Sequence, residues 1–301
     1  MGNAASVNIA HIDSYKKYLS DERMASENTV ISYIRDITRF ADFLENQGKH
    51  CFVTAAADDV RMFLSRLEEL DLSPATITRC IASLKAFYSH LLKIGVVARS
   101  PLTEVSVGVS EKKLPNILTT EQIERLFMQP DVTDPKGCRD KAMLETIYAT
   151  GLRVSELIAL DTDDVNLTTG LITCRSRNKE RSIPLYTAAV RSIENYLDTA
   201  RPKIASNDAL ALFVNSDGRR MSRQGFWKLL KSYSEKTMAG TDITPQTLRH
   251  SFAAHMLENG ADIRSLQEML GHANTSTTRL YSRVVKKQLK DVYAKSHPKA
   301  L

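Results

Sequence analysis

The chain has 301 residues, of which 43% are hydrophobic and 25% are charged, and it contains only 12 glycines and 9 prolines. This composition is that of an ordinary globular protein and excludes disordered and collagen-like chains, while no apolar run approaches the roughly 20 residues of a membrane-spanning helix. The net charge of +6 favours a polyanionic partner and disfavours a basic one.

Residues 1–100 predict a bundle of four helices. Apolar side chains recur there at three- and four-residue steps, which places each set on one helix face. The sets fall around residues 12–19, 30–44, 60–70 and 77–91. The polar segment 26–28 and Ser73, which a proline follows, predict capped helix starts, and Gly48 and Gly95 predict helix ends.

Basic residues lie on the outer faces of these predicted helices. Each one alone is explained as part of a solvated surface, but as a set on a small helical domain they also fit a face that contacts DNA phosphates. The set is Lys16, Lys17, Arg35, Arg39, Arg79, Lys85 and Lys93. Both interpretations stay open on the sequence.

The four cysteines, Cys51, Cys80, Cys138 and Cys174, are scattered along the chain and form no CxxC pair. Neither a disulfide framework nor a zinc site is therefore expected, and a reducing cytoplasm is the expected location. Cys80 has the spacing of a helix core position, so we expect it to be a small buried residue.

A domain boundary is predicted after the bundle. Residues 101–117 contain two prolines, a short charge cluster and little helical period, which indicates an interdomain linker. The second domain, 118–301, opens with Thr119 and Gln122 in a capping-box arrangement.

The second domain is predicted to be mostly helical with a small β component. Strands at 171–175 and 181–185 flank a polar turn at 176–180, and a further brief strand is expected at 211–214. The predicted fold class is therefore mainly α, with a helical-bundle N-terminal domain and a mostly α second domain that carries a small β-hairpin or sheet.

Two arginines occupy distinctive positions in the second domain. Arg153 stands at the start of the apolar helix predicted from residue 154, and Arg249 lies on a helix that Thr244 and a following proline open. A guanidinium presents a planar fork that matches phosphate and stays charged. For Arg153 the alternative is a surface ion pair with Glu156 one turn along the helix.

For other polar residues of the same region the sequence gives weaker evidence of a role in the site. Gln246 lies three residues before Arg249, so both side chains project from the same helix face. His250 and His255 are interpreted as packing or surface residues. The apolar pair Leu248 and Phe252 is expected to bury this helix.

His272 and Tyr281 follow near the C-terminus. His272 lies just past a helix that Gly271 is expected to end, and Tyr281 lies on the next predicted helix. A phenol has an unperturbed pKa of about 10, so attack at neutral pH needs cationic surroundings, which His272 and the two arginines would supply. A structural loop histidine and an aromatic packing residue are the alternatives for these two positions.

Taken in order, the segments GLRVSEL, LRHSFA, LGH and STTRLY resemble the tyrosine recombinase family, which is phage-integrase-like, and its Xer type in particular. The resemblance implies a core-binding (SAM-like) domain over residues 1–100 and a catalytic domain over residues 118–301, which close around DNA. It also implies that Arg153 and Arg249 bind the phosphate, that His272 donates a hydrogen bond to it, and that Tyr281 attacks it.

The chain departs from the family pattern at two places. Gln246 stands where the family usually has histidine, and an amide can donate a hydrogen bond but cannot transfer a proton as imidazole does. The family's catalytic lysine lies in a hairpin segment similar to GKGNKER, whereas this chain has the shorter SRNKER. Counting from the strand start selects Arg177, and the match to KER selects Lys179, so both stay candidates for the general acid.

The sequence thus predicts a site-specific DNA recombinase that works through a 3′-phosphotyrosyl intermediate. Its expected partners are double-stranded DNA with a specific target site and further protomers, as a homotetramer or with a paralogous recombinase, and no cofactor, metal or membrane is expected. Xer-like dimer resolution and mobile-element integration or excision both fit. Alternatives are a type IB topoisomerase and a catalytically impaired sequence-specific DNA-binding protein, for which Gln246 is the best argument.

The end of the chain offers one more expectation. A short helix after Tyr281 carries Leu289, Val292 and Tyr293, which form an apolar set. This set either docks on a neighbouring protomer, as the family resemblance implies, or folds back on its own domain.

Overall fold

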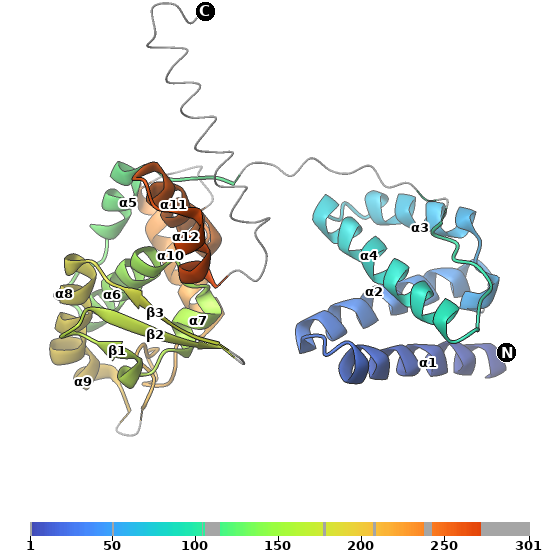
Figure 1. Cartoon of the computed structure of the whole chain (residues 1–301), viewed down its shortest axis with the longest axis horizontal. Helices are drawn as coiled ribbons and strands as arrows, with labels where there is room; N and C mark the ends of the chain where they lie inside the picture. Colours follow the sequence, from blue (N-terminus) through green and yellow to red (C-terminus); the bar gives the residue numbers. More distant parts are fainter. Residues whose placement is uncertain are drawn as a thin grey trace, which may run out of the picture. The chain divides into compact units, whose positions relative to one another are not determined.

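The computed structural model describes residues 2–49, 51–103, 105, 115–176, 179–206, 209–237 and 243–271. The chain folds into two compact units, residues 1–112 and residues 113–301, here called the N-terminal unit and the C-terminal unit (Figure 1). The division falls inside the segment expected to be a linker.

The N-terminal unit is a bundle of helices, as predicted. Its elements are α1 (Gly2–Lys17), which continues into a π-helical turn (Tyr18–Glu22), α2 (Glu27–Asn46), a 3-10 turn (Phe52–Thr54), α3 (Ala57–Glu69) and α4 (Pro74–Lys93). The predicted caps are present. Ser26 Oγ accepts a hydrogen bond from the Thr29 amide at 3.3 Å, and Ser73 Oγ accepts one from the Thr76 amide at 3.3 Å.

The core of this unit consists of the apolar faces that the periodicity predicted. Phe40, Phe52, Leu84 and Phe87 are fully buried in it, and so is Cys80, as expected. Gly48 and Gly95, which follow α2 and α4, both have a φ of 74°, a left-handed conformation that favours glycine at helix ends.

The C-terminal unit is mostly helical and carries one small sheet. Its helices are α5 (Thr120–Phe127), α6 (Pro135–Thr150), α7 (Val154–Ala159), α8 (Thr187–Asn195), a π-helical turn (Tyr196–Ala200), α9 (Arg201–Ile204), α10 (Arg223–Thr237), α11 (Pro245–Glu258) and α12 (Ile263–Leu270). The expected capping box opens α5, where the Thr119 amide donates to Gln122 Oε1 at 2.9 Å and the Gln122 amide donates to Thr119 Oγ1 at 3.2 Å.

The sheet is antiparallel, with the order β1 (Val165–Asn166), β2 (Leu171–Ser176) and β3 (Lys179–Pro184). The predicted hairpin is present, but its loop is shorter than expected, because Ser176 already pairs with Lys179 and only residues 177 and 178 lie between the strands. The brief strand expected at 211–214 is wrong. Ala211 and Val214 form only isolated bridges, to Asp161 and Arg220, and the third strand of the sheet is β1.

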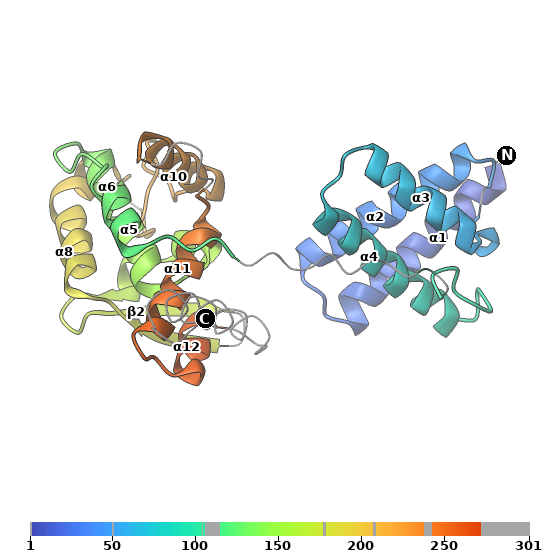
Figure 2. The same cartoon turned by 90° about the horizontal axis from the view of Figure 1, so that it is seen from above.

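Buried contacts around α6 fix the position of the site. Helix α11 packs on α6 and on α12 (Figure 2), and α12 packs on β3. Gly151 ends α6 with a φ of 59°, and a Cβ atom there would lie 2.3 Å from the Phe252 ring. Only glycine fits this close approach, which brings the end of α6, and Arg153 just after it, against α11.

Candidate active site

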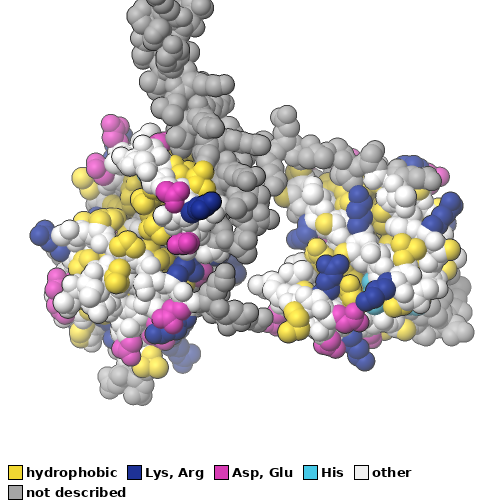
Figure 3. Space-filling view, in the orientation of Figure 1, with side chains coloured by type: hydrophobic (Ala, Val, Ile, Leu, Met, Phe, Trp, Pro, Cys, Tyr) yellow, Lys and Arg dark blue, Asp and Glu magenta, His cyan; other side chains and the backbone are white. Residues whose placement is uncertain are grey.

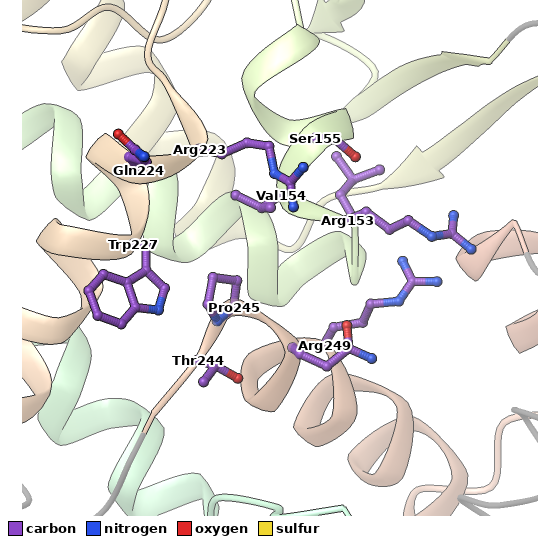
Figure 4. A pocket seen from close by; sticks show the side chains of 11 residues that line it. Arg153, Val154, Ser155, Arg223, Gln224, Trp227, Thr244, Pro245 and Arg249 are labelled. Atoms are coloured by element: carbon purple, nitrogen blue, oxygen red, sulfur yellow. The ribbon is translucent and has the colours of Figure 1, made fainter. Parts of the chain in front are cut away.

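A cavity of about 710 Å³ opens in the C-terminal unit where α7, α10 and α11 meet (Figure 4). Its walls come from three segments that are distant in sequence, residues 152–155, 223–227 and 244–249. Both predicted phosphate-binding arginines line it, and so does Gln246. The fold therefore brings together Arg153, Gln246 and Arg249.

Arg249 is held rigidly. Its helix begins as predicted, with Thr244 Oγ1 accepting from the Thr247 amide at 3.1 Å and with Pro245 in the first turn. The residue is only 2% exposed, and its guanidinium donates to the carbonyl oxygen of Gly151 and, at 2.7 Å, to that of Leu270. A guanidinium anchored by two backbone carbonyls has its orientation fixed before any ligand arrives, and Arg249 holds this position in the cavity wall.

Arg153 is the more accessible of the two. It forms the N-terminal cap position of α7, and 44% of its side chain is exposed. Its Nη1 donates to Glu156 Oε1 at 3.1 Å, and weaker contacts of 3.5 Å and 3.4 Å lead to the carbonyl oxygens of Leu270 and Gly271. Arg153 therefore forms the ion pair with Glu156 and also lines the cavity beside Arg249 (Figure 4).

Glu156 contacts three arginines, a role that the sequence alone did not identify. Its Oε2 accepts from the Arg153 amide at 2.8 Å and from Arg181 Nη2 at 3.0 Å, and Arg249 Nη1 lies 4.0 Å away. Burial by itself would raise the pKa of Glu156, but the hydrogen bonds from Arg181 and Arg153 and their charges outweigh it and hold the pKa below its ordinary value. One carboxylate thus orients three arginines and leaves their cluster with a surplus of positive charge.

Helix α10 forms the opposite wall of the cavity. Arg223, Gln224 and Trp227 project from it, with Trp227 44% exposed and Lys231 Nζ 5.2 Å from the centre of its ring (Figure 4). The sequence analysis did not predict these residues. The only signal for them in the sequence is a tryptophan among basic residues, in the run RQGFWK.

The remaining histidines of α11 have packing roles, as interpreted from the sequence. His255 Nδ1 lies 2.8 Å from the hydroxyl of Tyr148. His250 is half-buried, and burial lowers its pKa. Neither residue lines the cavity.

Several predicted site residues fall outside the described part of the chain. These are Arg177, His272 and Tyr281, together with the C-terminal set Leu289, Val292 and Tyr293. For Lys179 the backbone is described as the first residue of β3, paired with Ser176. Gly271, which precedes His272, ends α12 with a φ of 61°, as predicted.

The predicted basic set of the N-terminal unit is partly engaged. Arg79 donates two hydrogen bonds, of 3.0 Å and 2.9 Å, to the buried carboxylate of Asp36, and Lys93 pairs with Glu22 at 2.9 Å. Arg39 is half-buried, and the others, Lys16, Lys17, Arg35 and Lys85, are exposed. On the face drawn in Figure 3, basic side chains of this unit are separated by uncharged atoms.

Within the described residues, no group of three or more histidine, cysteine or acidic side chains is arranged to hold a metal ion. In the same part of the chain no helix has the length and apolar character needed to cross a bilayer. The four cysteines are free thiols, and all but Cys51 are buried.

Two family models match the chain. The model described as "Phage integrase, N-terminal SAM-like domain" matches residues 12–95, and the model described as "Phage integrase family" matches residues 116–288.

Curated relatives are similar over almost the whole chain. The tyrosine recombinase XerD of Listeria innocua is 41% identical over 295 residues, covering 96% of this chain and 99% of the relative. The protein of the same name from Oceanobacillus iheyensis is 42% identical over 297 residues, covering 96% and 98%.

Solved structures share the fold. The XerH site-specific recombinase bound to a palindromic difH substrate, in a post-cleavage complex, superposes with a TM-score of 0.77 at 21% identity, covering 94% of this chain and 84% of that one. A lambda integrase dimer bound to a COC′ core site gives a TM-score of 0.71 at 16% identity, covering 89% and 96%. Both likenesses span the N-terminal and the C-terminal units.

Proposed function

Since the chain belongs to the phage integrase family and is a tyrosine recombinase, an enzyme that breaks and rejoins DNA at specific sites, we propose that Tyr281 is its nucleophile and that Arg153 and Arg249 hold the scissile phosphate. The observation that supports the role of the two arginines is that both line one cavity, side by side. Two positive charges there would stabilise the negative charge that builds up on the nonbridging oxygens during attack.

The proposed chemistry conserves the bond energy of the DNA backbone. The Tyr281 oxygen forms a bond to phosphorus, its proton passes to solvent, and the bond from phosphorus to the 5′ oxygen breaks. The departing oxygen takes a proton from a general acid and becomes a 5′-hydroxyl. A 5′-hydroxyl of the partner duplex then attacks the 3′-phosphotyrosine and releases the phenol, so two strands are exchanged.

We favour Lys179 over Arg177 as that acid on chemical grounds, because a lysine ammonium gives up its proton more readily than a guanidinium. The backbone of Lys179 begins β3, where it pairs with Ser176.

A 5′-thiol leaving group separates the two candidates. We expect Lys179→Ala to slow cleavage of an ordinary nicked duplex by about 10²- to 10⁴-fold, because the departing alkoxide is no longer protonated. A thiolate needs no proton to leave, so the same variant should cleave the thiol-containing duplex at nearly the wild-type rate. Arg177→Ala should show no such rescue. The reverse pattern would assign the proton to Arg177.

The N-terminal unit and the oligomeric state complete the proposal. We assign DNA phosphate contacts to the exposed basic residues Lys16, Lys17, Arg35 and Lys85. Arg79 and Lys93 already pair with carboxylates, so we expect each to contribute less of its positive charge to DNA binding. Four protomers, identical or with a paralogue, would join two duplex sites. The Xer name of the curated relatives favours resolution of circular DNA dimers over mobile-element integration.

A plasmid assay tests the function as a whole. The target site is first selected from a random duplex pool by binding, and two copies are placed on a supercoiled plasmid. We expect resolution into two circles and no reaction on a plasmid without sites. Relaxation that ignores the sites would identify a topoisomerase instead, and specific binding without any covalent product would identify an impaired DNA-binding protein.

A further inference from the structure

We propose that Arg181 is a positioning residue that locks the hairpin end carrying Lys179 onto the C-terminal end of α12, the helix that precedes His272 in the sequence. The proposal rests on the assignment of Lys179 as the general acid and goes beyond it, because Arg181 itself does not line the cavity. Its role would be to hold the proton donor in register with the arginines that bind the phosphate.

The contacts of Arg181 join three segments. Its Nε donates to the carbonyl oxygen of Met269 in α12 at 2.8 Å, and its Nη2 donates to Glu156 Oε2 in α7 at 3.0 Å. The side chain is only 15% exposed and so keeps little freedom. A single guanidinium thereby ties β3 both to the helix that carries the Arg153 partner and to the helix that precedes His272.

Gly271 shows how close this contact is. A Cβ atom at residue 271 would lie 2.8 Å from Arg181 Nη1 and 2.9 Å from its Cζ. The φ of 61° already favours glycine at this position, and a side chain here would have to displace the guanidinium packed against it. Arg181 therefore covers the turn that leads directly into His272.

Three guanidinium groups share the carbonyl end of α12. Arg181 binds Met269, Arg249 binds Leu270, and Arg153 approaches Leu270 and Gly271. The last carbonyls of a helix carry partial negative charge, which these cations offset.

The short hairpin makes the anchor effective. Lys179 is the first residue of β3 and Arg181 the third, so only one residue separates the anchored position from the proposed acid. A displacement of about 1 Å at a reacting group lowers a rate by about 10²-fold. Loss of the anchor should therefore act mainly on protonation of the leaving oxygen.

The test compares Arg181→Ala and Arg181→Lys with wild type on duplexes with ordinary and 5′-thiol leaving groups. We expect cleavage of the ordinary duplex to fall by about 10- to 100-fold and cleavage of the thiol duplex by less than about threefold. In a Lys179→Ala background, Arg181→Ala should cost little more, because the residue that it positions is gone. If the alanine variant does not fold, the lysine variant, which keeps the charge but cannot make both contacts, carries the comparison.

Arg175→Ala is the matched control, since Arg175 lies on β2 of the same hairpin, is exposed, and pairs with Asp164. It should leave both rates unchanged. Equal losses on the two duplexes, or the same loss with and without Lys179, would show that Arg181 only stabilises the fold and would overturn the inference. The proposed function is judged separately, by wild-type cleavage and by the thiol rescue of Lys179→Ala on the same duplexes.

Discussion

Replacement of Tyr281 with phenylalanine is expected to reduce the covalent protein–DNA adduct by about 10⁴- to 10⁶-fold, the loss that removal of an enzyme's nucleophile produces. The phenyl ring keeps the shape of the side chain and removes only the oxygen that attacks phosphorus. Binding to the target duplex should therefore change by less than about twofold, because a single hydroxyl contributes little to an interface dominated by phosphate contacts.

The adduct is measured on a nicked duplex whose cleaved fragment diffuses away, with the product resolved by denaturing electrophoresis. Tyr186→Phe is the matched control, because Tyr186 is a partly exposed phenol of the same unit that does not line the cavity. Burial and the neighbouring Glu145 carboxylate raise the pKa of Tyr186, which makes it a poor nucleophile. An adduct formed by the Tyr281→Phe protein would refute the assignment.

Arg249→Lys is expected to lower the rate of cleavage by about 10²- to 10³-fold, the cost of losing one preorganised donor to a developing oxyanion. Lysine keeps the positive charge but not the planar fork that donates to the carbonyl oxygens of Gly151 and Leu270 at the same time. At least one buried carbonyl would lose its donor, so the free energy of unfolding should also fall, by about 1–3 kcal/mol.

Single-turnover cleavage and urea unfolding separate these two effects. Arg191→Lys serves as the control for a conservative exchange, because Arg191 is an exposed residue of α8 that does not line the cavity. A variant at position 249 that unfolds more easily but cleaves at the wild-type rate would show that Arg249 is a structural residue and not a phosphate ligand.

Much of the fold could be predicted because its signals are local. The apolar steps, the caps at Ser26, Ser73 and Thr119, and the helix-ending glycines each involve residues within one or two turns of one another, and each is present in the structure. The sheet was harder. Strand β1 has only two residues, too few for a period to show, and the apolar run at 211–214 is buried without joining the sheet.

The candidate site was predicted only in part, for a related reason. Arg153, Gln246 and Arg249 were identified through their motifs, and the structure brings them together. The role of Glu156 could not be predicted, because from sequence it pairs with Arg153 one turn away, whereas its contacts with Arg181 and Arg249 depend on tertiary packing. Nothing in the sequence identified Arg181 as part of the site, apart from its position two residues before the apolar Ile183 in the predicted strand.

The separate hydrophobic cores of the two units have a consequence for how a loss of stability in this enzyme is measured. Among the described residues, the cluster around Phe40 and Phe87 and the cluster around Leu144 and Phe226 have no member in common. A chain built in this way need not melt in one cooperative step, so a single melting temperature can hide the loss of one half. A systematic screen for inactivating substitutions would then recover two phenotypes. Some variants would no longer bind their substrate although the reaction centre is intact, and others would bind it without reacting.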